Sequence, residues 1–148
     1  MYFLHQSHNF ISYNHFSLPN NWYDNLRIKA LGRAMVTRKK VLIIDDEVDL
    51  CLLMKTYFLR KNYEVYIAHT LSDGVSRLNE ITPDFLFIDY NLPDGLGWDK
   101  LPDLYRKYPD IQFHLISAFR PTMPTELDGA KLTIWEKPIS LKSLDNFF

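Results

Sequence analysis

The strongest constraint on the fold of this chain is an alternation of short apolar runs with amphipathic stretches, which begins near Lys39. Five runs have the length and the β-branched or aromatic content of strands, at residues 41–44, 63–68, 85–88, 111–116 and 132–135. Apolar residues have helical spacing between or after these runs, at residues 49–61, 71–80, 98–108 and beyond Ser140. Strands that alternate with helices predict an α/β fold, in which right-handed crossovers join the strands of a parallel sheet.

Individual residues indicate where these helices begin, end or weaken. Asp46 or Asp49 is suited to cap the first helix, and Asn62 is suited to end it. Gly74 weakens the second helix, because glycine has a low helix propensity. Pro102 fits the third helix only in its first turn, where no backbone hydrogen bond is lost.

Composition limits the class of protein. The length of 148 residues, with 47% apolar and 24% charged residues, fits one globular domain that is large enough to bury a core. A net charge of −1 argues against general electrostatic binding to nucleic acid or to an anionic membrane. A single cysteine, Cys51, excludes an internal disulfide, and no apolar stretch is long enough to span a bilayer. His69 and His114 have no acidic or cysteine partner at metal-ligand spacing, so we interpret both as structural.

The net charge is the sum of two unlike parts. Residues 1–38 carry a net charge of +3 and 7 of the 22 aromatic residues, whereas residues 39–148 carry −4. We therefore predict an irregular, aromatic-rich N-terminal extension over 1–38 and a folded domain over 39–148. The extension has three interpretations: a docking arm, an extra element packed on the domain, or sequence upstream of the true start at Met35. It lacks the basic beginning and the apolar core of a signal peptide.

Polar residues follow the predicted strands in a pattern that indicates a site. Asp45 and Asp46 follow the first run, Asp89 the third, Ser117 the fourth and Lys137 the fifth. Parallel strands end at one edge of their sheet, where such sheets bind ligands, so we expect these side chains to meet. Three carboxylates repel one another and favour a divalent cation with oxygen ligands, Mg²⁺ or Mn²⁺. With a hydroxyl and a lysine beside them, one carboxylate is suited to form an aspartyl phosphate.

In these residues the chain resembles the receiver domain of two-component response regulators, of the stand-alone, chemotaxis type. The matching segments are Val-Leu-Ile-Ile-Asp-Asp-Glu at 41–47, Asp-Tyr-Asn-Leu-Pro-Asp-Gly at 89–95, Ser-Ala at 117–118 and Lys-Pro at 137–138. The resemblance covers about residues 39–148. It implies a flavodoxin-like fold, with a five-stranded parallel sheet in the order 2-1-3-4-5 flanked by helices.

The resemblance also implies a role for each acidic residue. Asp89 would be the phosphoacceptor, and it would contribute to the metal site. Asp46 would bind Mg²⁺ directly, and Asp45 would hold the ion partly through water. Asn91 would offer its backbone carbonyl to the metal.

Other matching residues would act on the phosphoryl group or report its presence. Lys137 would pair with the phosphoryl oxygens, and Ser117 would bond to the group and move. Ala118 is small, as expected beside a pocket that admits a donor histidine. The family often has Tyr or Phe three residues before the lysine, where this chain has Ile134 followed by Trp135. Either the aromatic switch is absent or the strand register is shifted by one residue.

The segment after Ser117 departs from the family as well. Pro121 and Pro124 leave little room for a helix over residues 118–130, so we expect a shortened fourth helix. Phe119 lies two residues beyond Ser117, where a bulky ring would restrict water and slow the hydrolysis of an aspartyl phosphate.

The main hypothesis from the sequence is a single-domain response regulator. It would take a phosphoryl group from a sensor histidine kinase or a histidine phosphotransfer protein, and it would signal by contact with a downstream protein. We expect a cytoplasmic protein, no binding of nucleic acid or membrane, and no catalysis beyond its own phosphorylation and dephosphorylation. Whether phosphorylation drives dimerisation stays open.

Three alternatives remain at this stage. The chain could be a receiver-like module that binds a partner without phosphorylation, or the receiver fragment of a truncated transcriptional regulator. A phosphatase of the haloacid dehalogenase type also uses aspartate, lysine and Mg²⁺. Its first strand ends in an Asp-x-Asp pattern, from which Asp45-Asp46-Glu47 departs.

Overall fold

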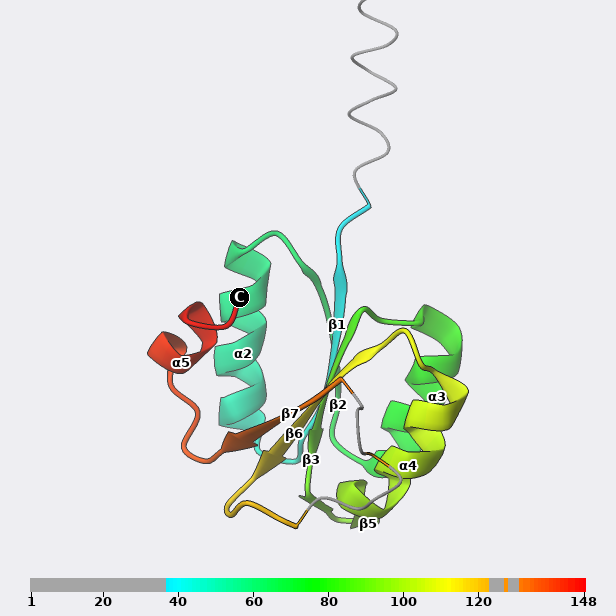
Figure 1. Ribbon diagram of the computed structural model, residues 1–148. Coiled ribbons are helices and arrows are strands. Elements are labelled where there is room, and N and C mark those ends of the chain that lie inside the picture. Colours follow the sequence, from blue (N-terminus) through cyan, green and yellow to red (C-terminus); the bar gives the residue numbers. More distant parts are fainter. Residues whose placement is uncertain (1–36, 123–126, 128–130) are drawn as a thin grey trace, which may run out of the picture. The chain divides into compact units, whose positions relative to one another are not determined.

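Five parallel strands form the central sheet, in the order β2-β1-β3-β6-β7 (Figure 1). They are β1 (Lys40–Ile44), β2 (Glu64–Ala68), β3 (Phe85–Asp89), β6 (Gln112–Ser117) and β7 (Leu132–Glu136). When only the strands of this sheet are numbered along the chain, their order is 2-1-3-4-5. The predicted fold class and strand order are therefore confirmed, and each predicted strand agrees with the observed one to within one residue at each end.

The computed structural model describes residues 37–122, 127 and 131–148. The chain divides between Thr37 and Arg38, and Arg38–Phe148 forms one compact unit. The N-terminal extension predicted over residues 1–38 lies outside the described residues except for its last two, so its three interpretations stay predictions. Most of the predicted fourth helix also lies outside the described residues, and its shortening stays a prediction too.

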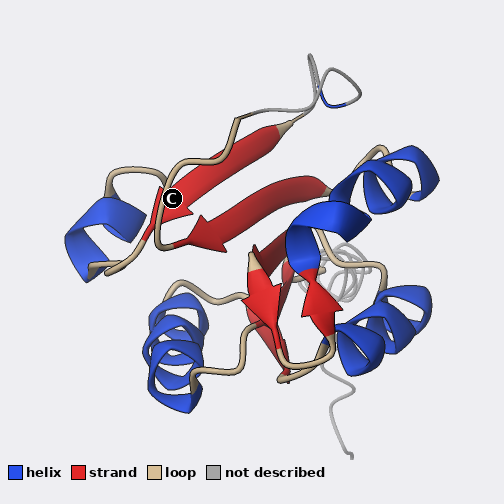
Figure 2. Cartoon of the chain, turned by 90° about the horizontal axis from the view of Figure 1, so that it is seen from below, coloured by secondary structure: helices blue, strands red, loops and turns tan. Residues whose placement is uncertain are grey.

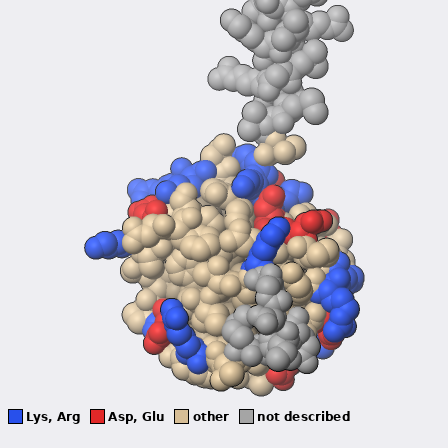
Figure 3. Space-filling model, viewed as in Figure 1, with Lys and Arg blue, Asp and Glu red and all other residues tan. Residues whose placement is uncertain are grey.

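Helices cover both faces of the sheet (Figures 1 and 2). One face is covered by α2 (Val48–Arg60) and α5 (Leu141–Asp145) and the other by α3 (Leu71–Ile81) and α4 (Gly97–Lys107). Within the part of the chain that the structure describes, no helix is both long enough and apolar enough to cross a membrane. Figure 3 shows basic and acidic side chains lying near one another around the edge of the face in view.

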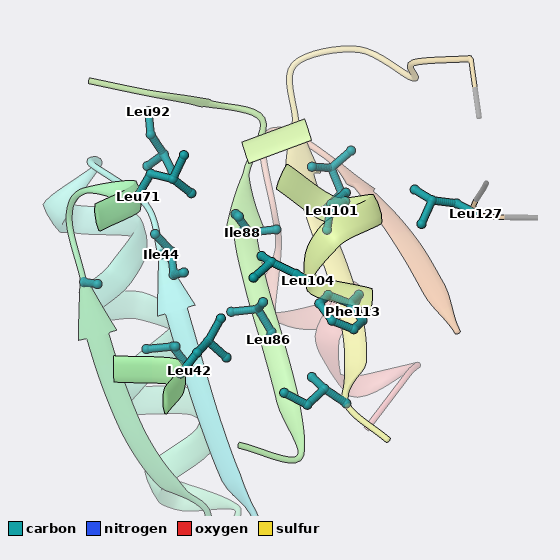
Figure 4. Close-up of a cluster of buried hydrophobic side chains, with 14 residues drawn as sticks. Leu42, Ile44, Leu71, Leu86, Ile88, Leu92, Leu101, Leu104, Phe113 and Leu127 are labelled. Atoms are coloured by element: carbon teal, nitrogen blue, oxygen red, sulfur yellow. The ribbon is translucent and has the colours of Figure 1, made fainter. Parts of the chain in front are cut away.

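The core is split by the sheet into two layers. Along β1, Leu42 and Ile44 point to the layer under α3 and α4, which Figure 4 shows. Val41 and Ile43 point to the layer under α2 and α5. Successive side chains of a strand point to opposite faces, and all four are fully buried, so an uninterrupted apolar run is the expected sequence of such a strand.

The first helix begins at a different cap from the one predicted. Glu47 is the N-cap residue of α2, and its side chain makes no capping hydrogen bond, so the assignment to Asp46 or Asp49 was wrong. Asp45 takes part instead, since its Oδ1 accepts a hydrogen bond of 2.8 Å from the Glu47 N–H. Asn62 follows the end of the helix with a φ of 65°, as the prediction that it ends the helix requires.

Pro102 lies in the second turn of α4, because this helix begins at Gly97, so the expected first-turn position was wrong. The helix tolerates the proline at the cost of one backbone hydrogen bond, the one that would reach the Trp98 carbonyl. Gly74 lies inside α3 and does not interrupt it. A Cβ at Gly74 would be 2.2 Å from Cδ1 of Ile44, so the glycine permits the close approach of α3 to β1.

Candidate functional site

Three carboxylates meet at the carboxyl edge of the sheet. Asp45 and Asp46 follow β1 directly, and Asp89 is the last residue of β3, the strand next to it. Each offers an oxygen, and these oxygens lie within 4.8 Å of one another. Asp45 is fully buried, Asp89 is 5% exposed and Asp46 is exposed. The sequence thus placed these three residues together correctly.

The two buried carboxylates resist ionisation. Burial raises the pKa of Asp45 to about 6, and the negative charge of Asp89 contributes in the same direction. Burial also raises the pKa of Asp89, although Lys137 opposes the shift. The Oδ2 atom of Asp45 is buried and makes no hydrogen bond among the described residues, although the Lys137 ammonium lies 3.4 Å away. A hard divalent cation binds to carboxylate oxygens of this kind, which are buried and not fully hydrogen-bonded. This donor set therefore suits Mg²⁺ or Mn²⁺.

Lys137 connects these carboxylates from the end of β7. Its Nζ lies 3.1 Å from Oδ1 of Asp89, 3.4 Å from Oδ2 of Asp45 and 2.5 Å from Oε1 of Glu47. Burial alone would lower the pKa of Lys137, but the hydrogen bonds to Glu47 and Asp89 and the nearby carboxylate charges raise it overall. No role for Glu47 was predicted from the sequence, although its position directly after the aspartate pair was a signal.

Ser117 ends β6 beside the lysine. The backbone N–H of Lys137 donates a 2.8 Å hydrogen bond to the Ser117 carbonyl. The hydroxyl oxygen of Ser117 accepts a 3.3 Å bond from the Phe119 N–H, and Ala118 lies between them in the chain. The ends of β6 and β7 therefore bring the predicted hydroxyl and ammonium groups to the acidic edge of the sheet.

These residues surround a cavity of about 490 Å³. It is lined by acidic, polar, small and aromatic residues: Asp46, Glu47, Asp89, Tyr90, Asn91, Ser117, Ala118, Phe119 and Lys137. Every residue predicted for metal binding or catalysis lines it except Asp45, which is fully buried.

The loop after Asp89 is fixed at both ends. The Asn91 N–H donates to Oδ2 of Asp89 at 3.3 Å, and Asn91 begins a small antiparallel hairpin of β4 (Asn91–Leu92) and β5 (Gly95–Leu96). At the tip of the hairpin, the Asp94 carboxylate accepts hydrogen bonds of 2.7 and 2.9 Å from the N–H groups of Leu71 and Ser72. These bonds to the start of α3 lower the pKa of Asp94.

The two candidate switch residues point to opposite faces of β7. Ile134 packs in the layer under α3 and α4, and Trp135 packs in the layer under α2 and α5. Trp135 donates a 2.9 Å hydrogen bond from Nε1 to Nδ1 of the fully buried His114. Trp135 therefore does not supply an aromatic ring on the Ile134 face, and any part of either residue in switching stays a prediction.

Three aromatic side chains form a row, of which Phe119 and Tyr90 line the cavity and Trp98 packs behind Tyr90; only Phe119 was singled out from the sequence. Phe119 is 51% exposed, and its ring meets the Tyr90 ring edge-on at 5.0 Å between centroids. Tyr90 in turn stacks on Trp98 at 6.1 Å. Tyr90 directly follows Asp89, so this row stands beside the carboxylate predicted to react.

The family of the chain follows from the sequence as well as from this geometry. Residues 41–146 match the response regulator receiver domain, and the chain belongs to this family. Receiver domains are signalling domains rather than enzymes in the usual sense, and histidine kinases or phosphotransfer proteins are their general partners.

Individual relatives agree with this assignment. The luminescence regulatory protein LuxO of Vibrio campbellii is 26% identical over 76 residues, which are 51% of this chain and 17% of that protein. The regulatory protein LuxO of Vibrio parahaemolyticus matches with the same figures, so the chain spans about a sixth of the curated relatives it matches.

Solved receiver domains share the fold. A CheY-like receiver domain protein from Methanospirillum hungatei superposes with a TM-score of 0.67 at 21% identity, over 75% of this chain and 90% of that one. The receiver domain of a LuxO repressor protein from Vibrio parahaemolyticus gives 0.62 at 23% identity, over 75% and 87%. The chemotaxis response regulator CheY4 of Vibrio cholerae gives 0.63 at 20% identity, over 75% and 96%.

Proposed function

We propose that this receiver domain accepts a phosphoryl group on Asp89 from a phosphohistidine of a histidine kinase or a phosphotransfer protein. Mg²⁺ would be held by Asp45, Asp46, Asp89 and the backbone carbonyl of Asn91. The observation that carries this proposal is the convergence of three carboxylate oxygens within 4.8 Å, with the Lys137 ammonium 3.1 Å from Asp89. Phosphorylation would alter the contact of the domain with a downstream protein.

The chemistry needs positioning and charge neutralisation more than covalent assistance. A carboxylate oxygen of Asp89 attacks phosphorus, the P–N bond to the donor histidine breaks, and the imidazole takes a proton from water. Lys137 neutralises negative charge on the transferred oxygens, and the Ser117 hydroxyl donates to one of them. Mg²⁺ held by these acidic residues would supply further positive charge to offset the repulsion between the carboxylates and the incoming phosphoryl group.

Detection of an acyl phosphate on the protein tests this proposal directly. Incubation with acetyl phosphate and Mg²⁺ should add one phosphoryl group, seen by intact mass, and Asp89→Asn should abolish the addition. Chelation of the metal should also abolish it, because the carboxylates then repel the incoming anion. Asp103→Asn is the matched control, since Asp103 pairs on the surface with Arg106 and has no contact with the site.

Two outcomes would contradict the proposal. Labelling that persists in Asp89→Asn would place the acceptor elsewhere. A wild-type protein that takes no phosphoryl group, either from acetyl phosphate or from a histidine kinase, would favour a receiver domain that binds its partner without phosphorylation.

Phe119 should lengthen the life of the phosphorylated state. Its exposed ring stands over Tyr90 at the cavity mouth, where it limits the approach of water to an acyl phosphate on Asp89. We expect Phe119→Ala to shorten the half-life of the acyl phosphate several-fold, measured by the decay of the added mass. Phe119→Leu keeps an apolar bulk and should stay close to wild type. Equal half-lives for all three proteins would remove this role.

A further inference from the structure

The ammonium of Lys137 has its shortest contact with Glu47, not with the aspartates. The Nζ–Oε1 distance to Glu47 is 2.5 Å, compared with 3.1 Å to Asp89 and 3.4 Å to Asp45. An ammonium group has three donor hydrogens, and three carboxylates here compete for them. A phosphoryl group on Asp89 would draw the Lys137 ammonium toward its own oxygens, in competition with the contacts to these carboxylates.

Burial decides which of the three contacts is easiest to release. The Asp45 side chain is fully buried, and that of Asp89 is 8% exposed and would itself carry the phosphoryl group. The Glu47 side chain is 58% exposed, so water can replace the lysine at its carboxylate. A buried carboxylate that lost its partner would have no such compensation.

The Glu47 side chain does not stabilise the start of α2. Glu47 is the N-cap residue of α2, but its carboxylate makes no capping bond. Among the described residues, the Lys137 ammonium, 90 positions away in the chain, is its hydrogen-bond partner. The carboxylate can therefore leave the lysine without breaking the start of the helix, where the backbone N–H of Glu47 donates a hydrogen bond to Oδ1 of Asp45.

We propose that Glu47 is a positioning residue that holds Lys137 in the unphosphorylated domain and competes with the phosphoryl group for its ammonium. Glu47 thereby lowers the affinity of the site for phosphoryl anions and sets a threshold for phosphorylation. This inference rests on the proposed phosphorylation of Asp89. It goes beyond it because it assigns an inhibitory role to a carboxylate outside the acidic trio.

Beryllofluoride tests the competition, because it binds to a carboxylate in the manner of a phosphoryl group. Titration in the presence of Mg²⁺, followed by the bound ¹⁹F resonances, gives an apparent Kd. We expect Glu47→Gln to lower this Kd about 5-fold, which corresponds to about 1 kcal/mol. Glu136→Gln is the matched control: it removes one negative charge from an exposed residue next to Lys137, and should leave the Kd near wild type.

A double-mutant cycle separates competition for the lysine from a general charge effect. In a Lys137→Ala background, Glu47→Gln should change the Kd no more than Glu136→Gln does. If Lys137 is present and the wild type binds beryllofluoride, equal Kd values for Glu47→Gln and Glu136→Gln would contradict this inference. The proposed phosphorylation of Asp89 would not be affected by that result. Weaker binding in Glu47→Gln, with loss of Mg²⁺ affinity, would make Glu47 a metal ligand and overturn it. A wild-type protein that binds no beryllofluoride would contradict the proposed function, and this inference with it.

Discussion

Replacement of Gly97 by alanine is expected to lower the free energy of unfolding by about 3 kcal/mol. A Cβ at Gly97 would lie 2.1 Å from the carbonyl oxygen of Asp89 and 2.8 Å from Cγ1 of Ile88. Alanine gains about 1 kcal/mol of helix propensity at this position, but the overlap with a backbone atom outweighs that gain. The start of α4 or the backbone of Asp89 has to move, so phosphorylation should slow as well.

Urea unfolding measures the loss of stability as a lower midpoint at constant slope. Gly74→Ala is the comparison, because its Cβ would meet only side-chain atoms of Ile44. Adding Ile44→Val should recover part of the stability lost in Gly74→Ala. Adding Ile88→Val to Gly97→Ala should recover little, since the Asp89 carbonyl remains in place. Wild-type stability and wild-type phosphorylation in Gly97→Ala would show that α4 does not begin against Asp89.

The sheet and the acidic site could be predicted because both depend on short-range patterns. A strand buried on both faces has to be an apolar run, and Val41 to Ile44 meets this condition. Once the strands are parallel, the residues that follow them meet at one edge without further information. This is why Asp45, Asp89 and Lys137 were brought together correctly from positions far apart in the sequence.

The contacts that were missed depend on side-chain directions, which no local pattern encodes. Asp94 reaches Leu71 across 23 positions, and the hairpin that brings them together is not visible in the composition of the turn. Glu47 was visible in the sequence, but its bond depends on where Lys137 points. The N-cap of α2 was misassigned because several acidic residues in succession offer the same signal, and the tertiary position of Asp45 decides among them.

His114 is expected to destabilise the folded domain in acid, by roughly 3 kcal/mol at pH 4 relative to pH 7.5. The ring is fully buried, stacks on Phe87 at 4.4 Å and accepts a hydrogen bond from Trp135. Burial lowers the pKa of His114 from 6.5 to about 3. Below pH 6.5 the His114 imidazole binds a proton in the unfolded chain, whereas in the folded domain it stays neutral down to about pH 3. The unfolded state therefore gains stability throughout this window.

Asp45 acts in the opposite direction and partly hides this effect in the wild type. Its pKa is raised to about 6 in the folded domain, from 3.8 in an unfolded chain. As the pH falls from 6 to 4, the folded domain takes up this proton first and gains roughly 2 kcal/mol of stability. Without metal, the acid loss in the wild type should therefore be small, and Asp45→Asn should make it steeper.

His114→Asn isolates the contribution of His114 to the pH dependence of stability. The asparagine side-chain oxygen can still accept the Trp135 hydrogen bond, and the amide does not titrate in this range. The variant should be less stable than wild type at pH 7.5, since it leaves part of the aromatic cluster empty. The difference between the two proteins should shrink by roughly 3 kcal/mol on going to pH 4, measured by urea unfolding in the presence of a chelator. A difference that stays constant with pH would mean that His114 titrates alike in the folded and unfolded states. In that case the His114 ring of β6 could not be buried and neutral among its aromatic neighbours.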